Sequence, residues 1–182
     1  WYQRSSSQGQ PYAAYSIAQM YRYGEYVTKD NDTAQRYYKQ ALSGFLKIES
    51  DDMANDDLFY KLGQMFNLGL GTDSDVTKAI EYFRRSAEMN NKNGLFEYGK
   101  ALLTGEHIPQ DTDSAVKLLE KAVKLKNSNA KRFLALEYIS GEHLEQDFEK
   151  GIALLTECAD SGDVIASYRL GKIYLQGEIM PQ

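Results

Sequence analysis

The sequence predicts an all-α fold, an α/α right-handed superhelical solenoid built from helix-turn-helix repeats. Three observations support this prediction. One eight-residue pattern recurs along the chain, each copy of the pattern ends in glycine, and an aspartate follows four of the five copies at a constant distance. Because a single helical hairpin cannot cover its own apolar faces, stacked copies must share a core, and each repeat then contacts mainly its neighbours.

The recurring pattern has a period of 36 residues. Its copies are IAQMYRYG, LGQMFNLG, YGKALLTG, LALEYISG and LGKIYLQG, and the fifth residue of each serves here as an anchor: Tyr21, Phe66, Leu102, Tyr138 and Tyr174. The last four anchors are 36 residues apart, whereas the first interval is 45 residues, which is 36 plus an insertion of nine. A fixed period of this length is typical of stacked helical repeats.

The first helix of each repeat is predicted to end three residues after its anchor. Glycine stands there in all five copies, and glycine adopts without a Cβ clash the left-handed conformation in which many helices end. These residues are Gly24, Gly69, Gly105, Gly141 and Gly177. A small residue three places before each anchor, such as Ala18 or Gly63, allows a second helix to pack closely.

The second helix of each repeat is predicted to begin nine residues after the anchor. An aspartate at a helix N-cap accepts a hydrogen bond from a backbone amide that lacks a partner within the helix. The residues at this position are Asp30, Asp75, Asp111 and Asp147. A pair of large residues and then an alanine follow at helical spacing, so each unit is predicted to be an αα-hairpin.

The nine-residue insertion lies near Phe45 to Asn55. We expect it to extend the second helix of the first full repeat and then to loop out. It carries or adjoins four acidic residues, Glu49, Asp51, Asp52 and Asp56. Two interpretations are open, a contact patch and a solvated extension of the helix.

Composition narrows the classes of partner. The 182 residues are 42% hydrophobic and 26% charged, and the net charge is −5 with no block of Lys and Arg. Such a chain is a poor match for nucleic acid or for an anionic membrane, and no apolar run approaches the ~18 residues of a membrane span. The single cysteine fits a reducing compartment. We therefore expect a cytoplasmic protein, unless a signal segment precedes residue 1.

Residues suited to catalysis or metal binding are few. His107 and His143 occupy matching G-E-H turns beside Glu106 and Glu142, where exposed loop residues are expected and a weak metal site is the alternative. Cys158 stands where other repeats have a small residue, which predicts a packed thiol. The sequence predicts no catalytic residue, no metal site and no cofactor, and hence a protein that is not an enzyme.

The complete repeat resembles a known family. The order A-x-x-x-L-G-x-x-Y-x-x-G, a short loop, D-x-x-K-A, an aromatic pair and A-A-x-x-G is similar to the Sel-1-like repeat, a relative of the tetratricopeptide repeat. The resemblance covers the whole chain and implies a helical repeat fold; for function it implies regulators and adaptors. Leu102 departs from the aromatic anchor, and Tyr26, His107, His143 and Ile179 stand where a second loop glycine is usual.

The repeat register predicts a single domain over residues 1–182. It comprises a half repeat at 1–9, repeats at about 10–56, 57–92, 93–128 and 129–164, and a half repeat at 165–182. The segment GEIMPQ at the end copies GEHIPQ, after which Asp111 begins a helix. Half repeats at both ends indicate a fragment of a longer protein.

In tetratricopeptide-like stacks the first helices line the concave side, so first-helix residues opposite the core are candidates for binding a partner. Six places before the anchor is a mainly aromatic column, and two places before it is a mainly amide and amine column. The candidate set is Tyr15, Gln19, Arg22, Tyr60, Gln64, Asn67, Phe96, Lys100, Arg132, Tyr168 and Lys172. Aromatic rings supply contact area, and amides bond a peptide backbone. The alternative is that the rings pack between adjacent first helices.

We therefore expect a non-catalytic scaffold or adaptor that binds a protein or peptide on the concave helical surface. Two other functions are open. The chain could be an accessory repeat tail of a larger enzyme, for example a bacterial mobilisation relaxase, or a purely structural, self-associating array.

Overall fold

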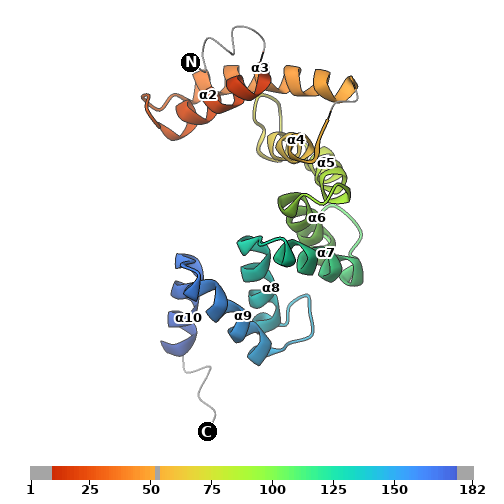
Figure 1. Cartoon of the computed structure of the whole chain (residues 1–182), viewed down its shortest axis with the longest axis vertical. Helices are drawn as coiled ribbons and strands as arrows, with labels where there is room; N and C mark the ends of the chain where they lie inside the picture. The colour runs from red at the N-terminus through yellow and green to blue at the C-terminus, as the bar shows by residue number, and fades with distance from the viewer. Residues whose placement is uncertain (1–9, 52–53, 176–182) are drawn as a thin grey trace. The chain divides into compact units, whose positions relative to one another are not determined.

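The computed structural model describes residues 10–51 and 54–175 (Figure 1). All regular secondary structure in these residues is α-helical, which confirms the predicted all-α repeat fold. The first helices of the repeats are α2 (Pro11–Tyr23), α4 (Asp56–Leu68), α6 (Lys92–Thr104), α8 (Ser128–Ser140) and α10 (Val164–Leu175). The second helices are α3 (Asn31–Ser50), α5 (Val76–Glu88), α7 (Thr112–Lys124) and α9 (Phe148–Asp160).

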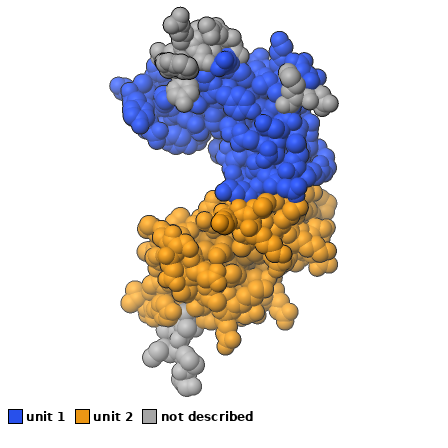
Figure 2. Space-filling view, in the orientation of Figure 1, with its two compact units in different colours: residues 1–94 blue, residues 95–182 orange. Residues whose placement is uncertain are grey.

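The chain divides into two compact units, Trp1–Gly94 and Leu95–Gln182, with the boundary inside α6 (Figure 2). In the first unit α2 packs on α3, and α4 packs on α5. In the second unit α8 packs on α9, and α9 also packs on α10. Each unit is therefore a set of helical hairpins with its own core.

Both predicted cap positions are confirmed within the described residues. Gly24, Gly69, Gly105 and Gly141 have φ between 62° and 76°, the left-handed conformation expected at a helix end; Gly177 lies outside the described residues. At the start of each second helix an aspartate carboxylate accepts a bond from the backbone amide three residues on. The four bonds are those to Thr33, Lys78, Ser114 and Lys150, at 2.9–3.0 Å.

A backbone bond that the sequence did not predict fixes the distance between anchor and cap. The amide of each capping aspartate donates to the carbonyl of its anchor, nine residues earlier. The pairs are Asp30–Tyr21, Asp75–Phe66, Asp111–Leu102 and Asp147–Tyr138, at 2.9–3.0 Å. Each loop is closed by one such bond, which explains why loop length is constant in the four repeats.

Most buried residues follow the predicted helical faces, and α10 departs from them. Phe66 and Leu102 are buried anchors, but Tyr174 is 59% exposed. In α10 it is Leu170 and Ile173 that join the cluster of buried residues shared with α8 and α9. No helix follows α10 in the described part of the chain, so nothing there packs on Tyr174. Cys158 lies in the same cluster at 3% exposure, which confirms the predicted packed thiol.

The insertion lengthens α3 to 20 residues, against 13 in each other second helix, as expected. The solvated interpretation is wrong for Glu49. Its carboxylate accepts a 2.7 Å bond from the Tyr82 hydroxyl and pairs with the Arg85 guanidinium, both on α5. Arg85 in turn lies 4.0 Å from the centroid of the Phe59 ring. The extension therefore ties the second helices of two successive repeats together; Asp52 lies outside the described residues.

Candidate partner-binding surface

The eleven predicted partner-binding residues lie on first helices in both units, and we call this set the first-helix face. In the first unit α2 carries Tyr15, Gln19 and Arg22, and α4 carries Tyr60, Gln64 and Asn67. In the second unit they are Phe96 and Lys100 on α6, Arg132 on α8, and Tyr168 and Lys172 on α10.

Two members of the aromatic column contact other aromatic rings of the fold. Tyr15 is 7% exposed, and its ring centroid lies 5.5 Å from that of Tyr38 and 6.0 Å from that of Phe45, both on α3. Burial raises the pKa of the Tyr15 phenol far above its usual value. Phe96 makes an edge-to-face contact with Phe133 of α8, with centroids 5.9 Å apart. Both rings stabilise the repeats; Tyr15 offers little surface to a partner, whereas Phe96 is partly exposed.

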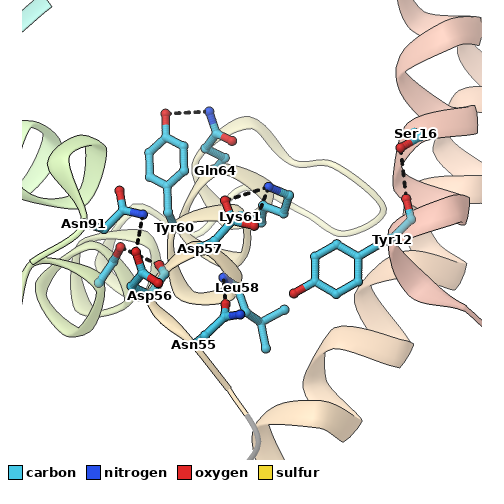
Figure 3. A network of polar contacts seen from close by, with 11 residues as sticks. Tyr12, Ser16, Asn55, Asp56, Asp57, Leu58, Tyr60, Lys61, Gln64 and Asn91 are labelled. Atoms are coloured by element: carbon cyan, nitrogen blue, oxygen red, sulfur yellow. Dashed lines mark hydrogen bonds and ion pairs between the residues drawn. The ribbon is translucent and has the colours of Figure 1, made fainter. Parts of the chain in front are cut away.

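The other two aromatic members also reach the surface. Tyr60 is partly exposed, and its hydroxyl accepts a 2.9 Å bond from the side-chain amide of Gln64 one helical turn away (Figure 3). Tyr168 is 69% exposed on α10. The aromatic column therefore combines packed rings with rings that reach the surface.

Every predicted member of the amide and amine column reaches the surface. Gln19 and Gln64 are partly exposed, and Lys100 and Lys172 are exposed. Asn67 is exposed as well, and Arg22 lies beside the ring of Tyr23, 5.4 Å from its centroid. Hydrogen-bond donors thus recur on first helices in both units.

Beside the first-helix face of the first unit, the charges of Lys61 and Asp57 balance each other. Lys61 forms an ion pair with Asp57 at 2.8 Å (Figure 3). The Lys61 amine also lies 5.9 Å from the Tyr15 ring centroid. Tyr12 is 40% exposed, and burial followed by the negative charge of Asp57 raises its pKa. Sequence reasoning missed Lys61, although its spacing of four residues from Asp57 is that of a helical ion pair. Apart from Arg22, the members of the first-helix face in this unit are neutral polar or aromatic residues.

Arg132 is held by neighbours in the second unit. Its guanidinium pairs with Asp163 and donates a 2.8 Å bond to the Asn129 side chain. Asp163 also accepts from the amides of Ile165 and Ala166, at 3.0 Å each, at the start of α10. Burial would raise the Asp163 pKa, but the Ala166 amide and the guanidinium outweigh burial and lower it. Arg132 therefore joins two repeats through its polar side chain.

The two histidines lie in separate surroundings. His107 is exposed with φ 64°, whereas the Nδ1 atom of His143 lies 2.9 Å from a carboxylate oxygen of buried Glu137. The described residues contain no group of three or more His, Cys, Asp or Glu side chains arranged to hold a metal ion. No helix in that part of the chain has the length and apolar character of a membrane span.

Comparison with known proteins gives a consistent result for the fold. A family model described as the Sel1 repeat matches residues 11–44, 60–91, 93–127, 128–163 and 164–182. A Sel1 repeat protein from Oxalobacter formigenes is 25% identical with a TM-score of 0.67, and the match covers 97% of this chain and 69% of that one. No curated protein matches the sequence.

Two further solved structures share the fold. One is a protective antigen of uropathogenic Escherichia coli strains with an SLR fold; it is 23% identical with a TM-score of 0.66, and the match covers 97% of this chain and 44% of that one. The other is a Pseudomonas aeruginosa protein, 21% identical with a TM-score of 0.55 over 91% of this chain and 58% of its own. This chain therefore spans less than two thirds of either protein.

Proposed function

Because the chain belongs to the Sel1 repeat family, we propose that it is a non-catalytic scaffold that binds a polypeptide on its first-helix face. Sel1 repeats generally mediate protein–protein interaction. In this proposal the face is the concave side of the repeat stack, the protein acts in the cytoplasm, and its ligand is a protein or peptide.

The observation that carries the proposal is the accessible amide and amine column. Gln19, Gln64, Lys100 and Lys172 occupy one helical position in four repeats, and none of them is buried. Amides bond both the carbonyl and the N–H of a peptide backbone, whereas amines bond carbonyls and carboxylates. Such groups on the first helices of each unit suit an extended or helical polypeptide.

The members of the face have different parts in this proposal. The groups that contact the ligand are those at the surface: Gln19, Arg22, Tyr60, Gln64, Asn67, Lys100, Tyr168 and Lys172. Tyr15, Phe96 and Arg132 hold the first helices in place through their contacts with Tyr38, Phe133 and Asp163. A substitution in the second group is expected to lower stability as well as binding.

Removing the column tests the proposal. The triple variant Gln19→Ala, Gln64→Ala, Lys172→Ala is assayed by fluorescence anisotropy against peptides selected for binding from a displayed library. We expect affinity to fall at least about tenfold, since several hydrogen bonds are lost, while the melting temperature changes little because the side chains are at the surface.

The matched control is Lys39→Ala, Lys47→Ala, Lys117→Ala, three exposed residues of second helices. It removes a similar amount of side chain from the other set of helices, so affinity is expected to remain that of the unaltered chain. Equal losses in both triple variants, or no loss in the first, would contradict binding on the first-helix face.

A further inference from the structure

A cavity of about 470 Å³ lies in the second unit, where the turn between α7 and α8 meets the turn between α9 and α10. This volume is in the range of pockets that hold small ligands or single side chains. Val123 and the buried Cys158 form an apolar part of its wall. Asn129 and Arg132 also line the cavity, and Arg132 belongs to the first-helix face. Neither turn alone forms the cavity, so it depends on the stacking of two repeats.

The lining of the cavity is basic although the chain as a whole is acidic. Three cations, Lys126, Lys131 and Arg132, face one carboxylate, Asp163, in a protein of net charge −5. Arg132 and Asp163 neutralise each other. Lys126 and Lys131 are then the remaining charged residues of the lining.

The two lysines differ in how firmly they are held. Lys131 pairs at 2.8 Å with Glu157, whose side chain is 62% exposed. An ion pair this exposed contributes little free energy, so another carboxylate can replace Glu157 at small cost. Lys126 is exposed, and none of the ion pairs among the described residues includes its amine.

Lys126 also occupies a backbone position that favours glycine. Its φ is 60°, and the residue one period later, which occupies the same turn, is Gly162 with φ 88°. One period earlier the position holds Asn90, also left-handed with φ 64°. Lysine is a poor residue for this conformation, yet here the conformation places a cation beside the cavity.

We propose that this cavity binds a carboxylate of the polypeptide ligand, from an acidic side chain or from the chain's C-terminus, through Lys126 and Lys131. The inference rests on the proposed function and names the chemistry that the second unit recognises. The carboxylate takes the place of Glu157 on Lys131 and receives a second charged bond from Lys126. The oxygen of the Asn129 side-chain amide accepts from Arg132, and in this proposal the N–H groups of that amide, which donate to no described residue, bond the same carboxylate.

The variant Lys126→Gly tests the cavity without harming the fold. Glycine suits the left-handed turn, so thermal stability should stay the same or rise, while one of the two lysines is lost. The control Asn90→Gly makes the same backbone change at the equivalent turn of the first unit and leaves charge unaltered. A second control, Lys47→Gln, removes one exposed cation elsewhere in the chain.

The probes are peptides selected on the whole chain from a displayed library and then synthesised with a free or an amidated C-terminus, and with each Asp or Glu replaced by Asn or Gln. We expect Lys126→Gly to lower the affinity for the acidic peptides about tenfold, because one charge-assisted hydrogen bond is lost. Both control variants are expected to bind the peptides with the affinity of the unaltered chain. Loss on amidation identifies the C-terminus as the source of the carboxylate, and loss on side-chain replacement identifies Asp or Glu.

Selected peptides that bind Lys126→Gly as well as they bind the unaltered chain, or that need no carboxylate, would overturn the cavity assignment and leave the scaffold proposal standing. Failure to select any peptide that binds the chain would count against the scaffold itself.

Discussion

One turn position, five residues after the anchor, holds a different residue in different repeats. Tyr26, Gly71 and His107 all have positive φ there, at 64°, 73° and 64°. His143 keeps a negative φ, and its ring instead lies against the carboxylate of Glu137. The sequence identified Tyr26, His107 and His143 as departures from the usual glycine. It could not predict which of them keep the left-handed turn, because that depends on the contacts of each loop.

This difference predicts opposite effects for two glycine substitutions. His107→Gly removes the backbone strain of a non-glycine residue with positive φ, so we expect the free energy of unfolding to rise by roughly 0.5–1 kcal/mol. His143→Gly relieves no backbone strain and removes the partner of buried Glu137, so we expect the free energy of unfolding to fall. Urea titration of both variants measures the two values. A gain in His143→Gly, or a loss in His107→Gly, would contradict the assigned backbone conformations.

The capping carboxylates predict a loss of stability in acid. The hydroxyl and amide of Thr33 lower the pKa of Asp30, and those of Ser114 lower the pKa of Asp111. Each folded-state pKa lies below the unfolded one. The stabilisation is therefore present above the unfolded pKa, about 3.9, and is lost as pH falls through the folded pKa.

The prediction is checked by measuring the melting temperature of the double variant Asp30→Asn, Asp111→Asn across this acid range. Asparagine still caps a helix but does not titrate there, so the double variant should lose less stability on acidification than the unaltered chain. Identical acid profiles would show that these caps do not contribute to the pH dependence.

At the scale of helices and loops, α3 makes a close contact with the loop of the next repeat. The Gln35 side chain donates to the Gly69 carbonyl at 3.2 Å and accepts from the Gly71 amide at 2.6 Å. A Cβ on Gly71 would lie 2.3 Å from the backbone nitrogen of Lys39. Helical periodicity gives the face of each helix. It does not show that this loop touches the backbone of α3, so this tie between repeats was not predicted.

The contact predicts a large difference between two glycine-to-alanine substitutions. Gly71 and Gly162 both have positive φ, at 73° and 88°, but no atom lies within 4 Å of a Cβ on Gly162. We expect Gly162→Ala to lower the free energy of unfolding by about 1 kcal/mol, from the backbone alone. We expect Gly71→Ala to lower the free energy of unfolding by roughly 3 kcal/mol or more, because the backbone at Lys39 must also move. Similar losses in the two denaturation curves would contradict the close contact.

For the whole molecule, the sequence predicted the period, both kinds of helix cap and the helical faces, because each follows from local geometry. It did not predict the exposure of Tyr174 or which aromatic residues of the first-helix face are buried. The burial of Tyr15 depends on Tyr38 and Phe45 in another helix, so the position of Tyr15 along its own helix does not determine it. The cavity beside Lys126 also escaped prediction, since two turns about one period apart form it.

The central claim is that the first helices bind a polypeptide, and backbone amide chemical shifts test it most directly. The isotope-labelled chain is titrated with a peptide selected for binding, and the shifted amides are mapped along the sequence. We expect the largest shifts in α2, α4, α6, α8 and α10, near Gln19, Gln64, Lys100 and Lys172. Shifts concentrated in α3, α5, α7 and α9 would contradict the claim.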